Sequence, residues 1–263
     1  MQNRIVNHLF KNRLVLIADA CIIHKMNKPY SLMSKKRPRR KLPRNLEILY
    51  EDDDIIVVNK PAGLLTVKTE TDKTKTAQYI LTDYIRKGNY KSHRQIYVVH
   101  RLDQWTSGVL IFAKSHEIKE KLQEQWNETK KKYLAVVHGH LKQKEGVISS
   151  YLAENKFFVV YSTKDPSKGK LAHTAYKVIK ESERFSLVEV DLLTGRKNQI
   201  RVHLADLGHP IVGDRKYGKE DDEYKRLALH AKSISFKHPK SGKQMMFESK
   251  IPEYFKKCCQ KNG

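Results

Sequence analysis

Short apolar runs, rich in β-branched and aromatic residues and separated by short polar connections, constrain this chain's fold more than any other feature. Such runs are typical of β-strands, and short connections join antiparallel neighbours. The first two runs flank the acidic segment 51–54, which predicts a hairpin with a solvated turn; the alternative is that the acids bind a cation. The expected strands lie at residues 48–50, 55–58, 98–100, 108–113, 133–137, 146–152, 157–161, 174–179, 185–193, 227–236 and 244–247.

Three segments have the apolar spacing of amphipathic helices. The first, at residues 77–85, has Thr74 or Thr76 as its candidate cap and Gly88 as its stop. The second includes residues 118, 122 and 126, and the third spans 200–207 and ends at Gly208. Few helices among many strands predict an α+β fold, with a large mixed, mostly antiparallel β-sheet flanked by a few helices.

The charge indicates the kind of partner. The 263 residues include 52 Lys and Arg against 29 Asp and Glu, a net charge of +23, while 39% of the residues are hydrophobic, as in a globular protein. A surplus this large attracts polyanions, either nucleic acid or an anionic membrane, although solubility alone is the alternative reading. The chain has no apolar run long enough for a membrane span, and we expect no signal peptide.

The cysteines indicate the cellular compartment, and the first residues indicate a domain boundary. Cys21, Cys258 and Cys259 form neither a disulfide framework nor a zinc pattern, which predicts a reducing cytoplasm and no structural metal. Residues 1–44 hold 12 Lys and Arg and one acid, Asp19. We expect them to form a basic arm, either a phosphate contact or a solubilising linker, and residues 45–263 to form the main domain.

Three segments contain candidate functional residues. Residues 100–108 place Asp103 on a polar connection between two predicted strands, where a ligand can reach it, although the residue types alone favour an aspartate that caps a turn. Residues 194–204 open a predicted helix with basic side chains, a pattern that favours anions; His203 alone fits a core or surface histidine better than a catalyst. Tyr133 follows three lysines and suits base stacking or core packing.

Together these segments resemble the RluA family of pseudouridine synthases over most of residues 46–236. The catalytic signature of the family matches His100-Arg101-Leu102-Asp103 with Thr106-Ser107-Gly108, and Lys132-Tyr133 matches its tyrosine motif. The arginine motif matches Thr194-Gly195-Arg196 with Gln199-Ile200-Arg201-Val202-His203, continued at residues 207–214. Residues 59–64 resemble the end of the opening hairpin, and residues 227–231 resemble the closing motif.

The resemblance implies a cofactor-free isomerase that converts uridine in ribosomal or transfer RNA to pseudouridine. Asp103 would be the essential carboxylate, attacking C1′ or removing a proton from C2′ of the ribose. Arg201 would pair with Asp103, Tyr133 would stack on the uracil, and Leu229 would pack beside the ring. The uridine would be flipped out of its stack.

The remaining substrate-binding residues implied are Arg101, Thr106, Arg196 and Gln199, with Arg101 filling the vacated space or holding a phosphate. We expect a cytoplasmic monomer that binds no membrane. The chain departs from the family at Asn198, where histidine is common, and lacks a clear RNA-binding domain of the ribosomal-protein-S4 type before residue 45. The alternative functions are an RNA-binding protein with an inactive pocket and a glycosidase that releases free uracil.

Overall fold

Twelve strands form one sheet in the computed structural model, which describes residues 40–218 and 224–258. The sheet order is β1-β2-β3-β5-β11-β6-β10-β9-β7-β8, with β4 paired to β5 and β12 paired to β11. Every pair in this part is antiparallel except β5 with β11. The strands are β1 Arg40–Lys41, β2 Glu47–Glu51, β3 Ile55–Lys60, β4 Tyr97–Val98, β5 Ser107–Ala113, β6 Lys130–His138, β7 Glu145–Glu154, β8 Val160–Thr163, β9 Lys170–Glu181, β10 Phe185–Leu192, β11 Leu229–Lys237 and β12 Gln244–Glu248.

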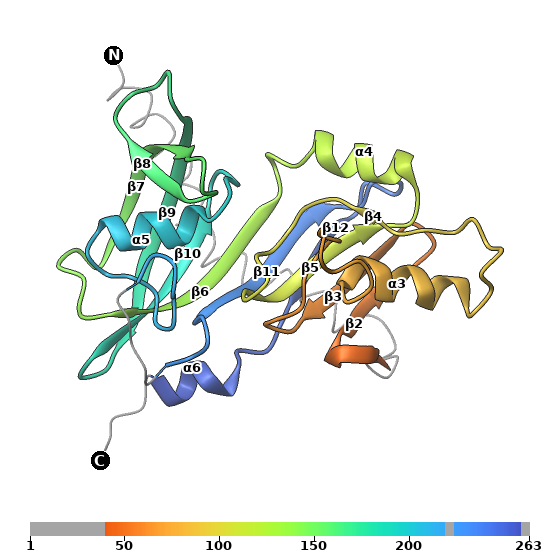
Figure 1. Cartoon of the computed structure of the whole chain (residues 1–263), viewed down its shortest axis with the longest axis horizontal. Coiled ribbons are helices and arrows are strands. Elements are labelled where there is room, and N and C mark those ends of the chain that lie inside the picture. The colour runs from red at the N-terminus through yellow and green to blue at the C-terminus, as the bar shows by residue number, and fades with distance from the viewer. Residues whose placement is uncertain (1–39, 219–223, 259–263) are drawn as a thin grey trace. The chain divides into compact units, whose positions relative to one another are not determined.

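Four α-helices accompany the sheet in the described ranges: α3 Ala77–Arg86, α4 His116–Glu124, α5 Gln199–Asp206 and α6 Glu253–Cys258. A 3-10 turn, Pro43–Asn45, joins β1 to β2. Figure 1 shows β6 and β11 running between the half of the sheet that packs against α5 and the half beside α3 and α4. The predicted α+β fold with a mixed, mostly antiparallel sheet is confirmed.

Burial explains why the sequence signals differ between strands. All residues of β5 are buried, and so are all but one of β3, because both strands lie within the sheet and both of their faces are covered. A continuous apolar run is what such strands require. In β9, nearer the edge, Ala172, Thr174 and Tyr176 are buried while the residues between them are not. This alternation is the pattern of a strand with one covered face.

Several predicted boundaries need correction. The strand expected at residues 98–100 is only Tyr97–Val98, and Trp126 lies beyond the end of α4. The strand expected at 157–161 begins only at Val160. The segment before it is a turn because the side chain of Asn155 accepts hydrogen bonds from the amides of Phe157 and Val159, at 2.9 and 3.0 Å. The helix after Thr194 was expected to be the last, but α6 follows it.

Other expectations hold. β2 and β3 form the predicted hairpin, and Thr76, one of two candidate caps, accepts a hydrogen bond from the amide of Tyr79 at the start of α3. The predicted basic arm lies mostly outside the described residues, but Arg40 and Lys41 already pair with β2, so the sheet begins before residue 45. Within the described ranges, no helix has both the length and the hydropathy that a membrane span needs.

Candidate active site

The connection between β4 and β5 holds Asp103, and two segments of the chain fix its backbone. The Asp103 carbonyl accepts a hydrogen bond from the Thr106 amide at 3.1 Å, which closes a turn. Before Asp103, the hydroxyl of Thr66 donates to the carbonyl of Leu102 at 2.9 Å and accepts from its amide at 3.3 Å. The backbone on the N-terminal side of Asp103 is therefore held by a buried side chain.

Lys60, at the end of β3, holds the backbone after Asp103. Its side chain is fully buried, and its Nζ donates to the carbonyls of Pro61, Leu64 and Gln104 at 3.1, 2.8 and 3.0 Å. Burial lowers the pKa of Lys60 to about 7, although the charge of Asp103 acts in the opposite direction. The sequence pattern does not reveal this role of Lys60, because a lysine at the end of an apolar strand normally reaches solvent.

The stability of the wild type relative to Lys60→Met should rise with pH. The folded-state pKa is near 7 and the ordinary lysine value is 10.5. Between these values the unfolded chain binds a proton that the folded chain has released, so raising the pH stabilises the folded state. Urea titrations at pH 7 to 9 should show a difference in unfolding free energy that grows by roughly 1 kcal/mol per pH unit. A difference that stays constant over this range would contradict the lowered pKa.

Gly108 places the Asp103 connection against β11. It has a φ of +115°, and a Cβ at this position would lie 2.1 Å from the carbonyl oxygen of Ala231. Only glycine therefore permits the short parallel contact that pairs Ser107 with His230 and Gly108 with Ala231. The Ser107 hydroxyl and the His230 Nδ1 lie 2.9 Å apart across this contact. The parallel contact between β5 and β11 brings Asp103 near Leu229, the first residue of β11.

Arg201, on α5, joins Asp103 to a second carboxylate. Its Nη1 donates to the Asp103 Oδ2 at 3.1 Å, while its Nε and Nη2 donate to Asp214 at 2.7 and 2.8 Å. The side chain of Asp214 is completely buried, and that of Arg201 is 13% exposed. Burial alone would lower the pKa of Arg201, but the hydrogen bonds and charges of Asp214 and Asp103 raise it well above its ordinary value. Arg201 is therefore a permanent cation with a fixed orientation.

All eight residues predicted to form the site line one pocket of about 90 Å³. Thr106, Tyr133 and Leu229 are buried wall residues, whereas Arg101 and Arg196 are exposed. Burial raises the pKa of Tyr133, and the nearby charge of Asp103 adds to the shift, so the phenol stays neutral. The predicted set is Arg101, Asp103, Thr106, Tyr133, Arg196, Gln199, Arg201 and Leu229.

Gln199 lines the pocket, but its amide is engaged within the protein. Its Oε1 accepts from the Thr194 hydroxyl and the Arg196 amide, and its Nε2 donates to the carbonyl of His173 and the hydroxyl of Thr174. These four bonds fix the connection between β10 and α5 that leads into the pocket. A direct bond from Gln199 to a substrate would have to replace one of them.

His203 is a core histidine, one of the two non-catalytic readings that the sequence favoured. It is fully buried, and its ring nitrogens lie 2.8 Å from the Thr174 hydroxyl and 3.0 Å from the Ser150 hydroxyl. Burial lowers its pKa to about 4, so the ring is neutral at physiological pH. It does not line the pocket.

Two further residues, Asp214 and Asn198, make contacts at the site that the sequence motifs do not reveal. Asp214 stands in the motif 207–214, but its contact with Arg201 depends on tertiary structure. The side-chain Nδ2 of Asn198 donates to the Asp103 Oδ2 at 2.7 Å. The sequence showed Asn198 only as a departure from the family pattern. Asp103 thus has two donors where one was expected.

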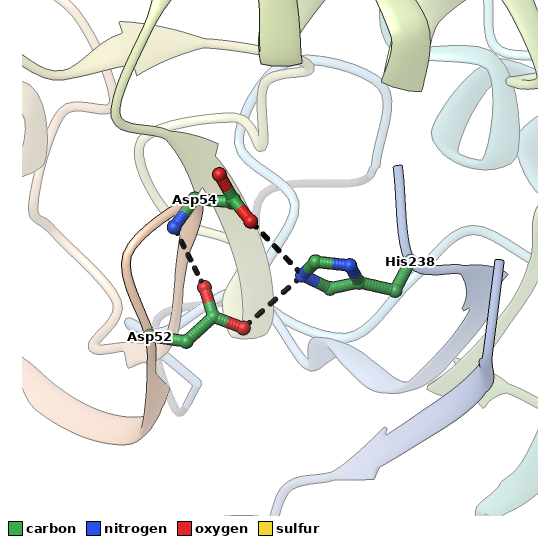
Figure 2. Close-up of side chains that lie close together, drawn as sticks. All are labelled: Asp52, Asp54 and His238. Carbon is green, nitrogen blue, oxygen red and sulfur yellow. Dashed lines mark hydrogen bonds and ion pairs between the residues drawn. The ribbon is translucent and has the colours of Figure 1, made fainter. Parts of the chain in front are cut away.

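A separate group in the described ranges, Asp52, Asp54 and His238, is close enough to hold a metal ion (Figure 2). The His238 Nδ1 accepts from the amides of Lys240 and Ser241, so the Nε2 carries the proton and donates to the Asp52 Oδ2 at 3.1 Å. A metal would need the lone pair that this proton occupies. The group therefore fits a hydrogen-bonded link from the β2–β3 turn to the end of β11 better than a metal site.

Comparisons with known proteins agree with this geometry. Residues 54–206 match the family model described as RNA pseudouridylate synthase. The chain is 38% identical over 221 residues to an uncharacterized RNA pseudouridine synthase of Bacillus subtilis, covering 82% of this chain and 72% of that protein. It is 37% identical over 214 residues to the dual-specificity RNA pseudouridine synthase RluA of Escherichia coli, covering 78% and 92%.

One further relative and one solved structure extend the comparison. The tRNA pseudouridine synthase C of Haemophilus ducreyi is 36% identical over 219 residues, covering 74% of this chain and 87% of that protein. The structure of human RNA pseudouridylate synthase domain containing 1 superposes with a TM-score of 0.63 at 26% identity, covering 79% of this chain and 84% of that chain. With the matched motifs gathered around one pocket, the chain belongs to the RluA family of RNA pseudouridine synthases.

Proposed function

We propose that this enzyme converts uridine in ribosomal or transfer RNA to pseudouridine, with Asp103 as the catalytic carboxylate and no cofactor. The main support is the ion pair between Asp103 and Arg201 at a pocket walled by Tyr133 and Leu229. We also propose that the enzyme acts as a monomer. RNA substrates of these classes support a cytoplasmic location.

The reaction itself sets what the pocket must do. The N1–C1′ bond breaks, the C5–C1′ bond forms, the C5 hydrogen leaves as a proton and N1 gains one, so the reaction needs no oxidant or reductant. Asp103 either attacks C1′ or removes a proton from C2′, and the Arg201 guanidinium donates a hydrogen bond to its carboxylate. Tyr133 and Leu229 hold the freed uracil while it turns.

A stacked uridine cannot reach this pocket. It must leave the stack, at a cost of a few kcal/mol. Arg101 is exposed and lines the pocket, where its guanidinium can occupy the vacated space or hold a phosphate. We assign Arg196, also exposed, to the neighbouring phosphate.

A larger cavity, of about 570 Å³, adjoins the pocket, and Gly195 and Arg196 line both. Its other lining residues include Lys168, Lys170 and Lys197. Basic side chains along a groove that leads out of an active site fit the phosphates of a nucleic-acid strand. We therefore place the RNA backbone beside the flipped uridine in this groove.

Replacing two groove lysines should weaken RNA binding without slowing the chemical step. Lys168→Ala with Lys170→Ala removes two cations, so affinity should fall about tenfold and the slope of log K against log salt should flatten by roughly 1 to 2. Filter binding at several salt concentrations and single-turnover rates at saturating RNA measure both effects. Lys119→Ala, on α4 at the other half of the sheet, is the matched control. An unchanged salt slope would place the RNA elsewhere.

Pseudouridine mapping tests the proposed function directly. Carbodiimide-based mapping of total RNA, from cells with and without this protein, should show particular uridines that lose their modification. Adding the purified enzyme to the unmodified RNA should restore the same positions. If no position in any cellular RNA changes and the purified enzyme modifies none, the proposed function is wrong.

A further inference from the structure

Both donors to the Asp103 carboxylate bind the same oxygen atom. The Asn198 Nδ2 and the Arg201 Nη1 donate to Oδ2, at 2.7 and 3.1 Å. No described residue donates to Oδ1. The side chain of Asp103 is 32% exposed and lines the pocket, and its Oδ1 is the oxygen whose hydrogen-bonding capacity the described residues leave unused. The two oxygens of this carboxylate are therefore distinct before any substrate binds.

Arg201 cannot fix the carboxylate alone. It makes one contact with Asp103, through Nη1, because its Nε and Nη2 are occupied by Asp214. One hydrogen bond to one oxygen leaves the carboxyl group free to rotate about its Cβ–Cγ bond. A second donor to Oδ2, from another direction, removes this freedom. Asn198 is that second donor.

The surrounding residues fix the orientation of the Asn198 amide. The Tyr217 hydroxyl donates to the Asn198 Oδ1 at 3.4 Å, and it accepts from the Val160 amide at 3.1 Å. Because the amide oxygen faces a donor, the amide nitrogen faces Asp103. The Tyr217 ring also lies against the Arg201 guanidinium, with 5.0 Å between the guanidinium carbon and the ring centroid. Tyr217 thus contacts both groups that hold Asp103.

The backbone at this position suits asparagine. Asn198 precedes the first residue of α5 and has a φ of 53° and a ψ of 15°, in the left-handed region. Asparagine, aspartate and glycine adopt this conformation with little strain, whereas most other residues do not. The same geometry therefore allows substitutions that change the side chain and leave the backbone in place.

We propose that Asn198 is a positioning residue for the reaction, which with Arg201 holds Oδ2 of Asp103 so that Oδ1 is the oxygen presented to the ribose. This inference rests on the proposed catalytic role of Asp103. Under this proposal Oδ1 is the reacting atom of Asp103. The hydrogen bond from Tyr217 to Asn198 then serves to align the Asp103 carboxylate. An amide also supplies this hydrogen bond without titrating near neutral pH, unlike an imidazole.

Two substitutions at position 198 separate the hydrogen bond from backbone effects. Asn198→Gly removes the donor and keeps the left-handed backbone, so kcat should fall about ten- to hundredfold, the range for loss of a hydrogen bond to a charged group, with RNA affinity within about twofold of wild type. Asn198→Asp keeps the shape but puts a second carboxylate against Asp103, so its kcat should fall further. If Asn198 had only a structural role, the order of the two kcat values would be reversed. Asn198→Asp, which keeps the size and shape of the side chain, would then be closer to wild type than Asn198→Gly.

A double-mutant cycle tests the route through Tyr217. Tyr217→Phe should lower kcat about threefold, and the Asn198→Gly, Tyr217→Phe double variant should match Asn198→Gly alone, because Tyr217 acts through the amide. Thermal unfolding of each variant identifies any loss of fold. A kcat for folded Asn198→Gly within twofold of wild type would overturn this inference and leave the proposed function intact. A wild type that forms no pseudouridine would instead refute the proposed function.

Discussion

Asp103→Asn should abolish pseudouridine formation while RNA binding survives. The substitution preserves the size of the side chain but removes both the nucleophile and the base, so the rate should fall at least about 10³-fold. Release of tritium from RNA labelled at C5 of uridine measures the reaction, and filter binding measures the affinity. Asp103 does not line the basic groove that we propose binds the RNA backbone, so the RNA affinity should change by less than about threefold.

The control for this experiment is Asp83→Asn, an exposed residue on α3. It should match the wild type in both measurements. Chromatography of the wild-type reaction distinguishes the glycosidase alternative, since a synthase releases no free uracil. Retained activity in Asp103→Asn would show that another group performs the chemistry, whereas equal RNA binding by an inactive wild type would favour a binding protein.

Asp214→Ala should destabilise the protein and also inactivate it. The substitution leaves the guanidinium of Arg201, whose side chain is 13% exposed, without its bidentate partner. Removing one partner of a buried ion pair typically costs about 3–5 kcal/mol, because the other charge stays buried. The freed guanidinium also loses the orientation that directs Nη1 to Asp103. Urea titrations give the unfolding free energy, and the tritium assay gives the rate.

A second substitution distinguishes the two effects of Asp214. Arg201→Met combined with Asp214→Ala removes both charges, so part of the lost stability should return while activity stays absent. The amides of Lys216 and Tyr217, which donate to Asp214, stay unpaired in both variants and keep the recovery incomplete. A loss below about 1 kcal/mol in Asp214→Ala would mean that Arg201 finds another partner or reaches water.

The sequence predicted those parts of the fold that local patterns determine. Continuous apolar runs marked β3 and β5, whose faces are covered on both sides, and Thr76 marked the start of α3. The turn at Asn155 was missed because Phe157 and Phe158 have high strand propensity and are nevertheless exposed. There a polar side chain bonded to the local backbone outweighs the propensity of its neighbours.

The residues of the site likewise fall into those that local motifs indicate and those whose contacts depend on the tertiary structure. The motifs indicated eight of the residues that line the pocket, since each motif keeps its members close in the chain. The contacts of Lys60 with Gln104 and of Asn198 with Asp103 connect segments far apart in the sequence. The contact of Asp214 with Arg201 spans only 13 residues, but it depends on how the chain turns after α5, and no local pattern predicts it. The short parallel contact between β5 and β11 was also missed, because its partners are more than a hundred residues apart in the chain.

The position of β11 has a consequence for biosynthesis. The strand follows β6 by about ninety residues, yet it lies between β5 and β6 and is the link through which the two halves of the sheet join. A nascent chain that has not yet extended past Leu229 cannot bring Asp103 beside Tyr133, however well each half has folded. Contacts this distant in the chain also slow folding. The ribosome must therefore have synthesised β11 before the newly made enzyme can modify any RNA.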